Sequence, residues 1–474
     1  KSLRSENKVK SLSTIMLPCG KGSDENKAIH SSYINNDPFA LPHDEDPAKD
    51  KCDSTKRKFC DASKDLGRDL KRFMGAMPEV NERIHQVDDA EVLPTVTEIK
   101  KLKTAYRVAY VHSQELLEKT NELIRIKGRA ELVHSLINAF GLLRYIKVVS
   151  PRVATDVEVL GFHCLDYITF LQSVSASEDI DDSYNPLDKD AENYGLSYDC
   201  PVQKGIYETC CLISGATIVA AEKLIDNSAD VAINWYGGWH HAKRDSASGF
   251  CYINDIVLGI LKLREKFDRI LYVDIDLHHG DGVEEAFCMT PKVMTVSFHK
   301  YVHGFFPGSG AVDDVGMGKG TFYSVNLPLL DGIKDAEFFA IFSRVMQLVR
   351  DKFQPQVIVM QCGADGLSSD PMASFNLTHM GIARCVGLML SWNLPTLLLG
   401  GGGYNFANTA RCWTFLTSLA AGKKLPLDIP EHENLPAYGS DFEMSTTAGN
   451  RKDCNLKQYL ANLMTKVFRN LSNI

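Results

Sequence analysis

Short apolar runs alternate with longer amphipathic stretches from about residue 105 to the C-terminus. The apolar runs carry hydrophobic side chains at successive positions, as do strands of a parallel sheet covered on both faces. They lie at residues 105–111, 231–235, 270–277, 357–365 and 395–405. The amphipathic stretches predict helices at residues 129–140, 206–224, 255–267, 336–353 and 378–392. The alternation predicts an α/β fold with a central, mostly parallel sheet and helices on both of its faces.

The first 100 residues have a different texture. Residues 20–58 are rich in Asn, Asp, Ser, Lys and Pro without a sustained apolar period, which predicts loop or disorder. The pattern at 65–77 predicts one amphipathic helix. The basic run at 56–58 is either a nuclear import signal or, as short basic runs usually are, solvated surface. We therefore expect an N-terminal extension at 1–100 and a folded domain at 101–474.

Bulk properties exclude some classes of protein. The net charge of −8 argues against nucleic acid as a direct partner and would suit a cationic peptide. The sequence lacks a run of about 18 apolar residues, so we expect no membrane span. The 13 cysteines are odd in number and include no C-x-x-C pair, which favours reduced thiols in a cytosolic or nuclear protein. The oligomeric state has no readable signal.

Polar, chemically capable residues follow four of the predicted strands. Asp274, Asp276 and His278 fall on one face of the run at 270–277 by the strand period of two. Burying two ionised carboxylates costs several kcal/mol unless a counter-charge compensates them. The other three strands end on residues 237–241 (GGWHH), on Asp365, and on residues 400–405 (GGGGYN). Ligands of open α/β sheets bind outside the carboxyl ends of the strands, so we expect these groups to converge there.

Asp276, His278 and Asp365 form a set of two carboxylates and one imidazole that leaves room for water, as catalytic metal sites do. Zinc or Fe(II) suits these ligands, and spacing alone does not choose between them. The alternative is that the three groups form buried ion pairs or cap helices.

The histidine pair His240 and His241 could supply acid and base chemistry. An imidazole beside metal-bound water can take its proton and later protonate a leaving amine, provided that a carboxylate orients it, and Asp274 and Asp281 are available. The alternative is a pair of satisfied core histidines. The phenol of Tyr404 could donate a hydrogen bond to a developing oxyanion.

Two aromatic positions lie in loops flanked by glycine. Phe250 and the pair Phe305–Phe306 either pack onto the body of the domain or form the walls of a narrow apolar slot for a long alkyl stem. The sequence alone does not set them face to face.

Five motifs resemble those of the class I, zinc-dependent histone deacetylases. They are WHHAKRDSASGFCYIND at 239–255, LYVDIDLHHGDGVEEAF at 271–287, GFFPGSG at 304–310, QCGADGLSSDPM at 361–372 and LGGGGYNFANTARCWT at 399–414. The last two look most like the deacetylase 8 type. The likeness covers about residue 105 to the C-terminus and has no counterpart in 1–100. It implies a three-layer αβα fold of the arginase/deacetylase type and a deacetylase catalytic domain at 101–474.

The resemblance also implies a role for each matching residue. Asp276, His278 and Asp365 would be the metal ligands, His241 the general base and acid, and His240 its electrostatic partner. Asp281 would orient His241, Asp274 would orient His240, and Tyr404 would polarise the scissile carbonyl. The acyl-lysine tunnel would be lined by Gly249, Phe250, Phe306, Met372 and Gly402, with Asp199 gripping substrate backbone at the rim and Arg129 beside an internal acetate channel.

Two potassium sites follow from the resemblance alone. One would use Asp274, Asp276, His278, Ser297 and Phe298, and the other Phe287, Thr290, Val293 and Tyr323. The expected cofactors are therefore Zn²⁺, with Fe²⁺ as the alternative, and K⁺.

The expected activity is hydrolysis of N-acetyl-lysine in histone tails and other acetylated proteins, in the nucleus and cytoplasm. The alternatives are a deacetylase of small acetylated amines such as polyamines, and a non-catalytic scaffold that binds acetylated chains. Two departures from the family pattern, a polar insert at 175–193 and His303 in place of a usual proline, lie where the pocket mouth is expected.

Overall fold

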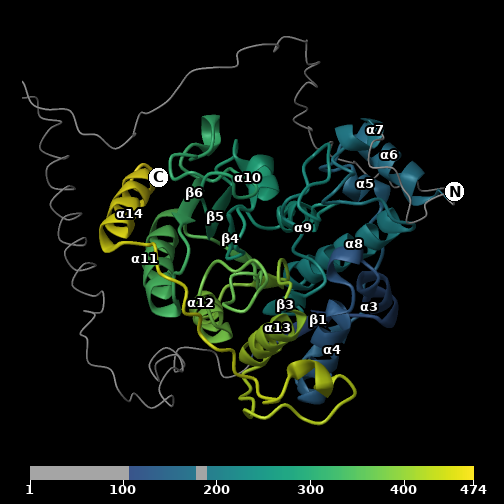
Figure 1. Cartoon of the computed structure of the whole chain (residues 1–474). Helices are drawn as coiled ribbons and strands as arrows, with labels where there is room; N and C mark the ends of the chain where they lie inside the picture. Colours follow the sequence, from purple (N-terminus) through teal and green to yellow (C-terminus); the bar gives the residue numbers. More distant parts are fainter. Residues whose placement is uncertain (1–105, 178–188) are drawn as a thin grey trace, which may run out of the picture. The chain divides into compact units, whose positions relative to one another are not determined.

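The computed structural model describes residues 106–177 and 189–474, and within them eight parallel strands form one sheet. The strand order is β2-β1-β3-β8-β7-β4-β5-β6 (Figure 1). The strands are β1 (Val108–Val111), β2 (Lys147–Val149), β3 (Val231–Asn234), β4 (Ile270–Asp274), β5 (Val293–Lys300), β6 (Ser324–Leu329), β7 (Val357–Gln361) and β8 (Thr396–Leu399). Every neighbouring pair is parallel, and the residues of the central strands β3, β8, β7 and β4 are all buried.

Helices flank the sheet in two groups, which Figure 1 shows on opposite sides of the strands. In one group α8 (Ile206–Ile225) packs on α9 (Asp255–Leu263), which contacts α10 (Asp281–Phe287). The other group runs from α4 (Arg129–Ala139) through α13 (Phe406–Ala420), α12 (His379–Leu390) and α11 (Asp335–Phe353) to α14 (Lys457–Leu471). The remaining α-helices are α3 (Gln114–Asn121), α5 (Asp156–Val159), α6 (Leu165–Ser175) and α7 (Lys189–Asn193). The predicted three-layer α/β fold is confirmed.

All five predicted strands and all five predicted helices are present, with shorter or shifted ends. The clearest error concerns Asp276 and His278, which were predicted to share a strand face with Asp274. Strand β4 ends at Asp274, because the carboxylates take over the backbone donors that a ladder would use. The Asp276 N–H donates to Asp274 Oδ1 at 3.0 Å, and the His278 N–H donates to Asp276 Oδ1 at 3.0 Å. The spacing of two therefore continues in a loop.

Several elements had no prediction, among them β2, β5, β6, α13 and α14. The predicted helix at 65–77 lies outside the described residues, and so does the middle of the polar insert at 175–193. The boundary near residue 100 stays a prediction. Among the described helices, none is long and apolar enough to cross a membrane. The described cysteines are free thiols and most of them are buried.

Candidate active site

Four loops meet at the carboxyl edge of the sheet because β3, β8, β7 and β4 are neighbours there. The loop after β3 carries His240 and His241, and the loop after β4 carries Asp276 and His278. Asp365 follows β7, and the residues 400–404 follow β8. The predicted convergence of these groups is therefore present in the structure.

Asp276, His278 and Asp365 offer one ligand atom each, and these atoms lie within 4.8 Å of one another. The side chains are held by further hydrogen bonds: Asp276 Oδ2 accepts from Gln361 Nε2 at 2.7 Å, and Asp365 Oδ1 accepts from the Leu277 N–H at 2.9 Å. His278 Nδ1 lies 2.9 Å from Asp365 Oδ2. These hydrogen bonds hold the three side chains in place with their possible ligand atoms close together.

The charge balance of this set fits a divalent cation. Burial, together with the neighbouring carboxylate of Asp276, raises the pKa of Asp365. Burial lowers the pKa of His278, but the same two carboxylates outweigh it and raise that pKa. Among the described residues, no Lys or Arg forms a salt bridge with either carboxylate. Two carboxylates and an imidazole that form no salt bridge with a described Lys or Arg suit a metal with an open coordination position.

His240 and His241 each pair with a carboxylate through Nδ1. His240 Nδ1 lies 2.7 Å from Asp274 Oδ2, which also accepts from the Tyr272 hydroxyl at 2.7 Å. His241 Nδ1 lies 2.7 Å from Asp281 Oδ1. Their ring centroids are 4.0 Å apart. The two predicted His–Asp pairs are therefore formed.

The two imidazoles differ in charge. Burial lowers the pKa of His240, but Asp274 and Asp276 outweigh it and raise that pKa to about 9. Burial, reinforced by neighbouring His240, lowers the pKa of His241 to about 3. His241 is therefore neutral near pH 7 and able to accept a proton, whereas the His240 imidazole is protonated on both nitrogens and carries a positive charge.

One cavity is lined by both histidines and by Tyr404. Burial raises the pKa of Tyr404 well above its usual value, so the phenol keeps its proton and can donate it in a hydrogen bond. Asp370 holds the loop that carries Tyr404, since Asp370 Oδ2 accepts from the Tyr404 N–H at 2.7 Å. The geometry thus suits a hydrogen bond to a developing oxyanion.

Gly249 and Phe250 line the cavity with backbone φ angles of +51° and +70°. The Phe250 ring meets Tyr404 edge-on at 5.7 Å, and Phe306 meets His241 edge-on at 4.8 Å. A Cβ on Gly249 would come within 2.5 Å of His241 Cδ2 and 2.8 Å of Phe306 Cε1. Only glycine therefore fits between the histidine and the aromatic ring.

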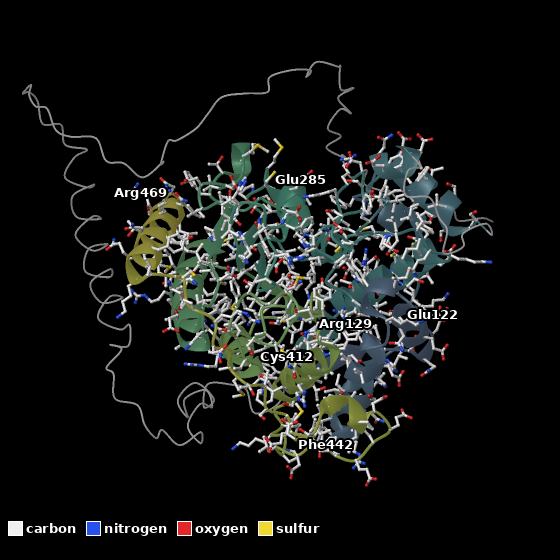
Figure 2. The ribbon with its side chains drawn as sticks, viewed as in Figure 1. Glu122, Arg129, Glu285, Cys412, Phe442 and Arg469 are labelled. Atoms are coloured by element: carbon white, nitrogen blue, oxygen red, sulfur yellow. The ribbon has the colours of Figure 1, made fainter. Side chains whose placement is uncertain are left out.

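Gly402 and Arg129 also line the cavity. The Gly402 N–H donates to Asp276 Oδ2 at 2.8 Å. Arg129, labelled in Figure 2, is the first residue of α4, and its guanidinium donates to the Gly401 and Gly403 carbonyls at 2.9 and 3.1 Å. Its guanidinium lies 5.0 Å from the Trp413 ring centroid. A buried cation thus faces the same cavity as the predicted metal ligands.

Met372 and Asp199 are outside the cavity lining. Met372 is half-buried, and its N–H donates to Asp370 Oδ1 at 2.9 Å. Asp199 is exposed in a turn, and the next residue, Cys200, contacts the Cys251 carbonyl at 3.8 Å. The turn therefore adjoins the loop that carries Phe250.

The predicted potassium ligands stay predictions. Ser297 pairs with Asp274 in the register of β4 and β5, and Phe298 is buried beside it. In the second set, the Phe287 carbonyl accepts from the Thr290 N–H, and the Tyr323 carbonyl accepts from the Thr295 N–H. Val293 is buried at the start of β5.

Sequence reasoning assigned no role to Gln361, Asp370, Tyr272 and Lys243, which hold the functional side chains. Asp370 and Gln361 stand in a motif quoted for the resemblance, and a polar residue within an otherwise apolar strand was the available signal for Gln361. Tyr272 and Lys243 also stand in quoted motifs, but nothing in the residue pattern marked them as supporting residues.

Comparison with known proteins identifies the family. A family model described as the histone deacetylase domain matches residues 123–420. The chain is 51% identical to a histone deacetylase 8 of Danio rerio over 367 residues, which are 77% of this chain and 96% of that protein. It is 50% identical to a histone deacetylase 8 of Xenopus tropicalis over 366 residues, 77% of this chain and 98% of that protein.

A more distant relative is a histone deacetylase 1 of Homo sapiens, 45% identical over 343 residues, which are 72% of this chain and 70% of that protein. The chain belongs to the histone deacetylase family. The predicted resemblance to class I, and to the deacetylase 8 type in particular, is confirmed. As a histone deacetylase the chain is a lysine deacetylase, which is a hydrolase. The family match does not favour the small-amine and scaffold alternatives.

Proposed function

We propose that this histone deacetylase hydrolyses N-acetyl-lysine in histone tails and other acetylated proteins, with zinc held by Asp276, His278 and Asp365. The observation that carries the proposal is that His241, paired with Asp281, lines one cavity with Tyr404, Asp276 and His278, and that Asp365 completes the ligand set. We also propose that the enzyme acts in the nucleus and cytoplasm, where its buried reduced thiols are stable.

When bound, the metal supplies a Lewis acid that polarises the amide carbonyl and activates water. His241 takes the proton of the attacking water on Nε2, since Nδ1 is committed to Asp281 at 2.7 Å. His241 then returns that proton to the departing lysine amine. His240, held by Asp274, keeps a positive charge beside the developing oxyanion.

Tyr404 donates its phenol proton in a hydrogen bond to the carbonyl oxygen as negative charge develops. The acyl-lysine stem would lie along Gly249, Phe250 and Phe306, with Gly402 and Met372 completing the wall. Asp199 would accept hydrogen bonds from substrate backbone N–H groups at the mouth. Supporting this, the Asp199 turn adjoins the Phe250 loop through Cys200.

Arg129, a buried residue of the cavity lining, offers the released acetate a cationic partner. Its guanidinium already binds two backbone carbonyls, so it is fixed in place. The two potassium sites, one at Ser297 and Phe298 and one at Phe287, Thr290, Val293 and Tyr323, complete the proposed set of ions.

Asp199→Ala tests the substrate class. A carboxylate that accepts hydrogen bonds from substrate amides contributes roughly 1.5 to 3 kcal/mol per bond, so kcat/KM for an acetylated peptide should fall on the order of tenfold or more. A minimal acetyl-lysine analogue and an acetylpolyamine should be turned over poorly and lose less. Asp245→Ala, an exposed carboxylate in the loop after β3, serves as the control. An undiminished peptide kcat/KM, with good turnover of acetylpolyamine, would favour the small-molecule alternative instead.

A further inference from the structure

Lys243 lies behind the His241–Asp281 pair, two residues after the histidine. Its Nζ is 2.7 Å from Asp281 Oδ2 and 3.0 Å from Glu285 Oε2. The other oxygen of Asp281 is the one that lies 2.7 Å from His241 Nδ1. The Asp281 carboxylate therefore bridges an imidazole and an ammonium, with one oxygen for each.

Both oxygens of Asp281 are needed to fix its plane. A carboxylate with a single partner can rotate about its Cβ–Cγ bond, whereas a charge-assisted hydrogen bond to the second oxygen holds it. Asp281 is 8% exposed, so water competes little for that second oxygen. Lys243 is thus placed to determine the direction in which Asp281 holds the imidazole.

The backbone holds Lys243 in register with the pair. The Lys243 N–H donates to the Ser246 carbonyl at 2.9 Å, and the Gly282 N–H donates to the His240 carbonyl at 3.0 Å. A Cβ on Gly282 would come within 2.5 Å of the Ala242 carbonyl oxygen, so the two loops touch closely at this point. The loop after β3 and the start of α10 are therefore in close contact around the carboxylate.

Lys262 in α9 forms ion pairs that are typical of a surface lysine. Its Nζ lies 3.0 Å from Glu265 and 3.9 Å from Glu222, and its side chain is 25% exposed against 22% for Lys243. Exposed pairs of this kind contribute little to stability. The two lysines match in exposure and in number of carboxylate partners, and they differ in that one partner of Lys243 also binds His241.

We propose that Lys243 is a positioning residue for deacetylation, which fixes Asp281 so that His241 presents Nε2 to the cavity. The inference rests on the acid and base role proposed for His241. Lys243 itself does not line the cavity and does not touch the substrate. Its loss should therefore slow the chemical step and leave substrate binding unchanged.

Steady-state kinetics of the metal-loaded full chain on an acetyl-lysine peptide test this. Lys243→Met should lower kcat by about 10- to 100-fold with KM unchanged, the loss typical of displaced supporting residues. Lys243→Arg, which keeps the charge and the donors, should restore most of kcat. Lys262→Met is the matched control and should match wild type. If Lys243→Met does not fold, Lys243→Gln, which keeps a donor without the charge, replaces it.

Two readouts separate positioning from a general structural role. In a His241→Gln background, Lys243→Met should cost no further kcat, and a further loss would overturn the inference. In wild type the His241 Nδ1 proton should give a downfield NMR signal that Lys243→Met shifts or broadens and Lys262→Met does not. If Lys243→Met keeps the wild-type kcat while His241→Gln lowers it, the role of Lys243 is overturned and the role of His241 stands. If His241→Gln also keeps the wild-type kcat, the proposed role of His241 is overturned as well.

Discussion

His240 and His163 are equally buried, at 3% and 2% exposed, yet they lie in very different surroundings. His240 lies at the carboxyl edge of the sheet, where Asp274 and Asp276 raise its pKa to about 9 against the effect of burial. His163 lies between α5 and α6, where the Asn254 N–H donates to its Nε2, and burial lowers its pKa to about 4. The carboxylates, and not burial, separate the two.

His379 extends the comparison to the start of α12. Its Nδ1 lies 2.8 Å from the Thr446 hydroxyl, and burial, reinforced by Arg411, lowers its pKa to about 4. Like His163 it is a neutral core histidine. Of these three buried histidines, the one to which we assign a chemical role is paired with a carboxylate at the strand ends, whereas the other two are paired with a hydroxyl or a backbone amide.

The largest effect is expected from removing a carboxylate of the metal set. Asp365→Ala should abolish activity, because two remaining ligands do not hold a metal against water and competing chelators. Asp335→Asn, which changes a half-buried carboxylate that accepts hydrogen bonds from Thr378, the N-cap residue of α12, should keep its metal and its turnover. Metal content per chain measures both, and full metal in Asp365→Ala would remove Asp365 from the site.

The two kinds of histidine should separate in kinetics. His241→Gln should lower kcat by about 10²- to 10⁴-fold, the usual contribution of a positioned acid or base. His379→Gln should leave kcat unchanged and act on stability alone. Equal losses in the two variants would show that the carboxylate partner does not mark the functional histidine.

Tyr404→Phe should cost about 10²- to 10³-fold in kcat with unchanged metal content, which is the usual loss for one oxyanion donor. The deficit belongs to kcat because the phenol interacts most strongly as charge develops on oxygen. A rise in KM with an unchanged kcat would mean that Tyr404 binds the substrate and does not stabilise the oxyanion.

The smallest effect concerns stability. His163 and His379 have folded pKa values near 4, below their ordinary value of 6.5. As pH falls from 6.5 toward 4, these histidines become protonated in the unfolded chain but stay neutral in the folded chain. For each of them, the free energy of unfolding should therefore fall by about 1.4 kcal/mol per unit decrease in pH. Denaturant unfolding at several pH values measures this slope. His379→Gln should have a shallower slope than wild type, and identical slopes would contradict the assignment.

The convergence of the three candidate metal ligands at the carboxyl edge could be predicted from the sequence, because each of them follows an apolar strand. Asp365 after β7 and Tyr404 after β8 could be placed this way once the sheet was taken as parallel. The positive φ of Phe250 and the fit of Gly249 against His241 depend on loop conformation, which has no periodic signal. Strand β5 was missed because Thr295, Ser297 and His299 interrupt its apolar pattern, although all three are buried.

The supporting residues were the hardest to find. Lys243 reads as one more surface lysine in a polar loop, and its contact with Asp281 joins segments separated by a helix and a strand. His163 and His379 could not be told apart from His240 by residue type or by local hydrophobicity. Their partners come from distant parts of the chain, such as Thr446 for His379.

If the carboxyl edge is a metal-dependent hydrolytic centre, activity should be lost with the metal, and metal removal tests this most directly. The wild-type chain is dialysed against a chelator, its metal content is measured, and zinc is added back while acetyl-lysine peptide turnover is followed. Turnover should vanish with the metal and return as a single equivalent of zinc binds, whereas Asp365→Ala should recover neither. Full turnover by a wild-type chain that metal analysis shows to be free of metal would mean that the hydrolytic centre does not depend on a metal.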